Sequence, residues 1–246
     1  MSPPIRDGSG SSIGSIRLGD GSEIAEVRTG AGDVLFSAIP DSEDLKTRYD
    51  TREVSFNDND SVSTFEDQAN NNDLTAGTAP TYKTNIVNSS LDVVRFDGSD
   101  DYLNTSFTQI SQPITFGLLA VCRDGSEDFE VAFDGDSADS MDFRTDNTNS
   151  WQLQVANNIA GGSQDTNTHI WTGLFDGANT KLRVDGTQVA SGDVGTSSVA
   201  GLTMGAQGSI ANFGKWDIVE HLLYPQDKSS KFGEIEDYLD RDTSIL

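Results

Sequence analysis

Polar and apolar residues alternate along many short stretches of this chain, and turns rich in glycine, aspartate and asparagine separate the stretches. Alternation with a period of two places successive side chains on opposite faces of a β-strand. The pattern predicts strands at residues 45–49, 61–66, 91–97, 101–106, 113–122, 128–134, 141–145, 150–156, 168–175, 180–184, 187–190, 200–205 and 216–224. This many short strands predict an all-β fold, a two-sheet antiparallel sandwich of jelly-roll type.

One helix is expected near the end of the chain, beginning within residues 227–231. Phe232, Ile235 and Leu239 recur at the spacing that gives a helix a single apolar face. We expect this C-terminal helix to lie across one edge of the sandwich.

The first residues form a separate unit. Pro, Gly and Ser are frequent in residues 1–12, which predicts a mobile arm, and three short strands are expected within residues 13–38. A meander this small buries too little apolar surface to be stable alone. We therefore divide the chain into an N-terminal arm and small β docking or oligomerisation unit, residues 1–38, and a sandwich domain, residues 39–246. Decoration of the sandwich edge is the alternative role for the first unit.

Five sequence blocks carry a resemblance to a known family. The strongest is residues 94–103, VRFDGSDDYL, which reads as two strands around a tight Asp-Gly turn. The others are residues 59–75, in which Phe65 stands where Trp is usual, 79–82, 171–186 and 216–224. In this order and spacing the blocks resemble laminin-G-like (concanavalin A-like) sandwich domains, over roughly residues 41–240.

The resemblance implies a binding role. Such domains occur in secreted proteins and in tail-fibre and capsid proteins of tailed viruses. We therefore expect a virion surface protein, a fibre, spike or turret component, that attaches to glycans on the host surface. Residues 1–38 would contact other virion proteins, and a homo-oligomer, a trimer or pentamer, would supply multivalency. A capsid decoration without receptor binding, a secreted adhesin and a glycoside-active enzyme remain alternatives.

We expect no enzymatic activity, since a fold alone does not supply a reaction. Sandwich glucanases place carboxylates on one strand face in the order Glu-x-Asp-x-Glu. Here Glu130, Ala132 and Asp134 share such a face, but the middle position carries no carboxylate.

Two candidate binding features remain. Asp134, Asp136 and Asp139 cluster hard oxygen ligands in one loop, which suits Ca²⁺ or another structural cation, with a solvated acidic loop as the alternative. No other cofactor is expected. Trp151 follows a polar loop and is a candidate for stacking on a sugar at a ligand-binding rim, although a core position is the alternative.

Charge limits the partners. The chain has 40 acidic and 16 basic residues, a net charge of −24. Nucleic acid is excluded as a partner because phosphate binding needs clustered Lys and Arg.

The beginning of the chain has no apolar stretch typical of a signal peptide, and no apolar run is long enough for a membrane helix. We expect a protein made in the host cytoplasm and carried on the virion surface.

The acidic residues include 30 Asp, whereas the basic residues include only 6 Lys, a balance typical of proteins from high-salt cytoplasm. An ordinary acidic phage protein is the alternative source. Self-repulsion of the surface is largely screened at molar salt, where the Debye length is about 3 Å. We predict that the melting temperature rises steeply in thermal melts from low to molar KCl. A flat profile would refute the halophilic origin.

Overall fold

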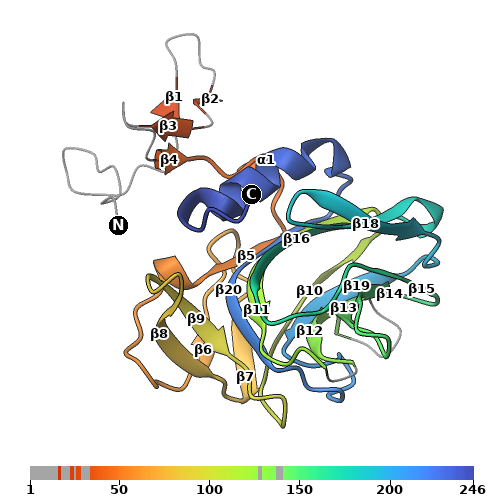
Figure 1. Ribbon diagram of the computed structural model, residues 1–246, viewed down its shortest axis with the longest axis horizontal. Helices are drawn as coiled ribbons and strands as arrows, with labels where there is room; N and C mark the ends of the chain where they lie inside the picture. The colour runs from red at the N-terminus through yellow and green to blue at the C-terminus, as the bar shows by residue number, and fades with distance from the viewer. Residues whose placement is uncertain (1–15, 18–22, 25, 29–33, 127–128, 137–140) are drawn as a thin grey trace.

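A computed structural model describes residues 16–17, 23–24, 26–28, 34–126, 129–136 and 141–246 of this chain. Two antiparallel sheets lie face to face and form a sandwich, with one helical segment at the C-terminal end (Figure 1). The predicted fold class is confirmed. Within the described residues, no helix has the length and apolar character needed to cross a lipid bilayer.

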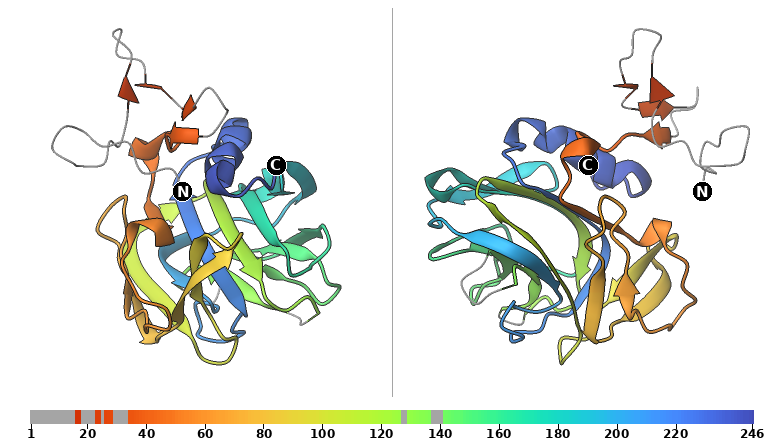
Figure 2. Two further views of the ribbon diagram at one scale, coloured as in Figure 1. Left: turned by 60° about the vertical axis from the view of Figure 1, so that its left-hand side comes forward. Right: turned by 180° about the vertical axis from the view of Figure 1, so that it is seen from behind.

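The first sheet contains eight strands. From one edge to the other they are β15 (Asn158–Gly161), β14 (Trp151–Gln154), β13 (Asp142–Thr145), β12 (Val131–Asp134), β19 (Ser198–Met204), β10 (Tyr102–Ser111), β7 (Leu74–Thr78) and β6 (Thr64–Phe65). Figure 2 shows how this sheet curves around one side of the molecule.

The second sheet packs face to face with the first. Its main path is β18 (Thr187–Gly192), β17 (Thr180–Val184), β16 (Thr168–Phe175), β11 (Ile114–Cys122), β20 (Trp216–Tyr224), β9 (Leu91–Arg95) and β8 (Thr81–Val87). The long strand β20 has two partners on one side. Its first half pairs with β9, and its second half pairs with β5 (Thr47–Asp50).

The strands β11 and β20 are buried on both faces, which explains their nearly continuous apolar sequences. Phe116, Leu118 and Ile218 point into the core between the two sheets. Leu119 and Leu222 belong to a second apolar cluster on the opposite face, beneath the C-terminal helix.

That helix covers the face of the second sheet. It consists of η4 (Ser229–Lys231), α1 (Phe232–Leu239) and η5 (Asp240–Asp242), and α1 packs on β11 and β16. At Gly117 on β11, an added Cβ would lie 2.9 Å from Ile235 Cγ2, so the glycine lets the helix approach closely. The prediction of the helix and of its apolar residues is confirmed. Its expected place on an edge was wrong, because the outer face of β11 is apolar and the helix buries it.

Three of the strands, namely β7, β8 and β15, were not predicted from the sequence. Their sequences, LTAGT, TYKTNIV and NIAG, are polar or short and lack apolar alternation. They lie at or next to sheet edges, where one face is exposed and pairing along the backbone is enough to hold them.

The N-terminal residues contain two short strand pairs within the described part. β1 (Ile16–Arg17) pairs with β2 (Glu23–Ile24), and β3 (Glu26–Arg28) pairs with β4 (Val34–Ser37). The expected arm at residues 1–12 lies outside the described residues, and the docking role of residues 1–38 stays a prediction.

Glu220 on β20 is fully buried, and arginines surround its carboxylate. Arg48 Nε lies 3.1 Å from Oε1, Arg241 Nη1 lies 2.8 Å from Oε2, and Arg52 also pairs with Oε2. Tyr238 of α1 donates its hydroxyl to Oε1 at 3.1 Å. A buried carboxylate is tolerated only with such partners, because removing its hydration is costly.

Asp50 at the end of β5 shares the same three arginines. Its Oδ2 lies 2.6 Å from Arg48 Nη2 and 3.1 Å from Arg241 Nη2, and its Oδ1 lies 2.8 Å from Arg52 Nε. Burial opposes ionisation of Asp50, but the three guanidinium groups outweigh it and lower its pKa to about 2. We call Asp50, Glu220 and their three arginines the arginine cluster. It joins β5, β20 and the C-terminal helix.

We predict that Glu220→Gln lowers the free energy of unfolding by about 3 kcal/mol, because three buried guanidinium groups would then share one carboxylate. Denaturant unfolding at constant salt measures the change. The control is Glu234→Gln on the exposed side of α1, where a pair with Lys231 at 3.6 Å should contribute less than about 0.5 kcal/mol. Equal stability of Glu220→Gln and wild type would contradict the role of the cluster.

Candidate functional site

An open depression of about 560 Å³ lies at one end of the sandwich, where three connections between strands meet. The connections join β10 to β11, β16 to β17, and β18 to β19, so the depression spans both sheets. Its lining residues are Ser111, Gln112, Asp176, Gly177, Ala178, Thr196, Ser197 and Ser198.

The Gln112 side chain holds the three connections together. Its Oε1 accepts a hydrogen bond from the Gly177 amide at 2.8 Å, and its Nε2 donates to the Gly195 carbonyl at 3.3 Å. Gly177 has a φ of 52°, a left-handed conformation that favours glycine. The amide contacts fix the positions of all three loops, so the depression is formed before any ligand arrives.

The chemistry of the lining is that of a hydrogen-bonding surface. Four of the lining residues are Ser or Thr, whose hydroxyl groups both donate and accept. Asp176 adds a carboxylate, and its Oδ2 accepts a hydrogen bond from Asn179 Nδ2 at 3.0 Å. Gln109 donates its amide to Ser198 Oγ, which leaves the Ser198 hydroxyl proton to be directed at another acceptor. Such a set of groups suits a ligand with many hydroxyl groups.

The depression was missed in the sequence analysis. Its residues come from three loops, and more than 60 residues of chain separate the first loop from the second. None of the loops carries a recognisable motif. The only signal in the sequence was the largely polar character of the three loops, which many turns share.

Two of the three aspartates of the predicted cation site, Asp134 and Asp136, lie within the described residues. Asp134 is buried, and its two carboxylate oxygens accept hydrogen bonds from the amides of Gly135 at 2.7 Å and Gly208 at 2.9 Å. Asp136 accepts one from the Ala200 amide at 3.2 Å. Asp139 lies outside the described residues. Backbone amides thus engage the two described carboxylates, and a cation at this loop stays a prediction.

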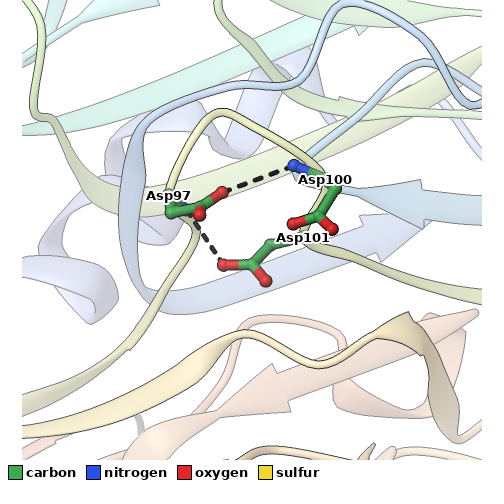
Figure 3. Close-up of side chains that lie close together, drawn as sticks. All are labelled: Asp97, Asp100 and Asp101. Atoms are coloured by element: carbon green, nitrogen blue, oxygen red, sulfur yellow. Dashed lines mark hydrogen bonds between the residues drawn. The ribbon is translucent and has the colours of Figure 1, made fainter.

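A different trio of carboxylates comes together at the turn after β9. Oxygens of Asp97, Asp100 and Asp101 lie within 4.8 Å of one another (Figure 3). Asp97 Oδ1 accepts hydrogen bonds from the amides of Ser99 and Asp100, and Asp101 Oδ2 accepts one from the Asp97 amide at 3.0 Å. Burial, aided by the two neighbouring carboxylates, raises the pKa of Asp101 to about 6. These contacts organise the turn between β9 and β10.

Trp151 lies in the core, where its side chain is 1% exposed, so its expected place on a ligand rim was wrong. Its ring centroid is 5.0 Å from Trp171 and 6.1 Å from Trp216. Gly162 packs over its edge, because an added Cβ there would lie 2.9 Å from Trp151 Cδ1. The polar loop before Trp151 suggested an exposed position. Trp151 is, however, the first residue of β14, and its side chain is already buried.

The structure places Asp142 close to Asp134, on paired strands of the first sheet. Both side chains are buried, at 4% and 3% exposure. Burial raises the pKa of Asp142, Arg144 at 3.5 Å opposes the shift, and the Asp134 carboxylate adds to it, so that the pKa of Asp142 is about 7. Glu130, the other carboxylate considered above, instead accepts a hydrogen bond from the Lys215 amide.

The two histidines, His169 and His221, are built into the framework. His169 lies between two carboxylates, with Nδ1 2.6 Å from Asp185 and Nε2 2.9 Å from Asp165. His221 is fully buried, and desolvation lowers its pKa to about 3, which keeps the ring neutral in the core.

Comparison with known proteins places the fold. No protein-family model matches the chain, and no curated protein matches its sequence. Trypanosoma rangeli sialidase with the inhibitor DANA superposes with a TM-score of 0.59 and 14% identity, over 90% of this chain and 36% of that one. The same enzyme with sialic acid gives 0.59 and 15% over the same shares. The receptor binding domain of botulinum neurotoxin C/D mosaic serotype gives 0.55 and 9%, over 79% of this chain and 51% of that one.

At these identities the likeness shows the β-sandwich fold alone. The chain spans 36% of the length of the sialidases it matches. The comparison also corrects one expectation, that the protein is not an enzyme. Sialidases are enzymes, and the likeness points to a fold found in glycosidases. The missing Glu-x-Asp-x-Glu pattern excluded only carboxylates on one strand, whereas Asp134 and Asp142 come from two.

We predict that Asp142→Asn flattens the dependence of stability on pH. The folded-state pKa of about 7 lies above the ordinary value of 3.8, so the folded protein holds the extra proton between these values. Stability of the wild type should therefore fall as pH rises from about 4 to about 7. At pH 8 the variant should be more stable, by on the order of 3 kcal/mol. Denaturant unfolding from pH 4 to 8 measures this, with the exposed Asp237→Asn on α1 as the control. A wild-type slope retained in Asp142→Asn would contradict it.

Proposed function

We propose that this chain is a carbohydrate-binding sandwich domain that recognises glycans through the depression formed by the loops after β10, β16 and β18. The observation that carries the proposal is the depression itself. Its lining is rich in hydroxyl groups, and Gln112 fixes its loops. The likeness to a receptor binding domain and to a sialidase solved with sialic acid supports this choice.

We propose further that the domain acts in attachment at the surface of a virion. The support is the order of sequence blocks that resembles sandwich domains of viral fibre and capsid proteins. A single shallow site binds sugars weakly, so attachment would require several copies. A homo-oligomer, with residues 1–38 contacting other virion proteins, would present these copies on one surface.

The test of glycan binding is Ala178→Trp, which places a large ring in the depression at an exposed position. We expect the wild type to bind members of an immobilised glycan panel and the variant to bind at least tenfold more weakly. Ala160→Trp is the matched control, because Ala160 is an exposed alanine on β15, outside the depression. Loss of binding in Ala160→Trp alone would move the site to the first sheet.

Adsorption to host cells separates attachment from capsid decoration. Purified oligomeric protein that acts in attachment should adsorb to host cells and compete with virus for them. A decoration protein would do neither.

A second candidate function, glycoside hydrolysis, is favoured by Asp134 and Asp142. Two neighbouring carboxyl groups, one with a raised pKa, are the groups that a glycosidase uses as acid and nucleophile or base. Hydrolysis of aryl glycosides by the wild type, lost in Asp142→Asn while the variant stays folded, would support this candidate.

A further inference from the structure

We propose that the depression selects neutral sugars that present two adjacent hydroxyl groups and rejects sialic acid and other anionic sugars. The proposal rests on the carbohydrate-binding function proposed above and specifies its ligand class. It also separates this chain from the sialidase that shares its fold, which has been solved with sialic acid.

The charge of the lining carries the first step. Among the described residues that line the depression, Asp176 is the one with a charged side chain, and no Lys, Arg or His is present. The three connecting loops, residues 112–113, 176–179 and 193–197, contain Asp176 and Asp193 and no basic residue. The exposed carboxylate of Asp193 binds the Gly195 amide at 2.8 Å, at the base of the third loop.

The nearest basic residue along these loops points away. Lys181 lies on β17 between Thr180 and Leu182, both of which are buried. Leu182 belongs to the core between the two sheets, so alternation along the strand directs Lys181 to the opposite face of the sheet. Lys181 is not among the residues that line the depression.

An anionic sugar would therefore lose hydration without gaining a counterion. Desolvation of a charged group is costly unless an opposite charge or several donors replace the water. Here the nearest charge is Asp176, which repels a carboxylate or sulfate. The net charge of −24 adds a long-range repulsion to the local one.

A neutral sugar meets favourable partners instead. The two oxygens of a carboxylate such as Asp176 can accept hydrogen bonds from two adjacent hydroxyl groups at once. Ser198, whose oxygen already accepts from Gln109, can donate to a ring or hydroxyl oxygen of the same sugar. Charge-assisted hydrogen bonds to Asp176 would supply the larger share of the binding, since they are stronger than neutral ones.

The experiment uses pairs of immobilised glycans that differ only by a terminal sialic acid or a sulfate group. The wild type should bind the neutral member of a pair at least tenfold more tightly than its anionic counterpart. The preference should shrink in molar KCl, because screening weakens the repulsion more than the hydrogen bonds. Thermal melts confirm that each variant is folded.

Two variants test the cause of the selectivity. Asp176→Asn removes the charge at nearly the same size, so it should weaken binding of the neutral glycan about tenfold and reduce the preference. Ala178→Arg adds a cation at an exposed lining position and should raise binding of the sialylated glycan at least tenfold. Ala160→Arg on β15 is the matched control and should change neither ligand.

The outcomes separate the two proposals. If the wild type binds the anionic member of a pair as tightly as the neutral one, or more tightly, the selectivity is refuted and carbohydrate binding stands. If no glycan binds, the proposed function and the selectivity both fail. If Ala160→Arg changes the preference and Ala178→Arg does not, the assignment to this depression is refuted.

Discussion

The pairing of two buried carboxylates with three arginines is the interaction on which the other features depend. Glu220 lies on the central strand β20 and Asp50 on β5, and neither side chain reaches water. Arg241 reaches both from the helical segment after α1. The cluster therefore joins the first strand of the sandwich, its centre and its C-terminal cover by charge, in addition to the apolar contacts of Ile235 and Leu239 with β11 and its neighbours.

This use of arginine has a consequence for the rest of the surface. The chain has only 10 Arg and 6 Lys against 40 acidic residues, and three of the arginines are taken by one buried cluster. Others also pair with buried carboxylates, as Arg95 does with Asp217 and Arg183 with Glu236. Few cations remain for the loops, and none is found among the described residues that line the depression at the end of the sandwich. The same scarcity of cations underlies the preference for neutral ligands that we propose for the site.

Most of the fold could be predicted because its strongest signals are local. Apolar sequence patterns located β9, β11, β16 and β20, and the spacing of Phe232, Ile235 and Leu239 located α1. The candidate site could not be predicted in the same way. Trp151 shows the reason. An aromatic residue after a polar loop has the same sequence pattern whether its ring points outward or, as here, into the core. Asp142 likewise gains its raised pKa from burial and from Asp134, which pairing of β12 with β13 brings near.

The sequence by itself determined the class of fold, the residues of the chain that form the helix, and the excess of negative charge. These depend on periodicity and composition, which are properties of neighbouring residues and of totals. Only the tertiary structure decided which loops meet at Gln112, which carboxylates lie buried beside one another, and that the helix covers a sheet face. Those outcomes depend on strand order in the two sheets, and strand order is fixed by contacts between residues far apart in the chain.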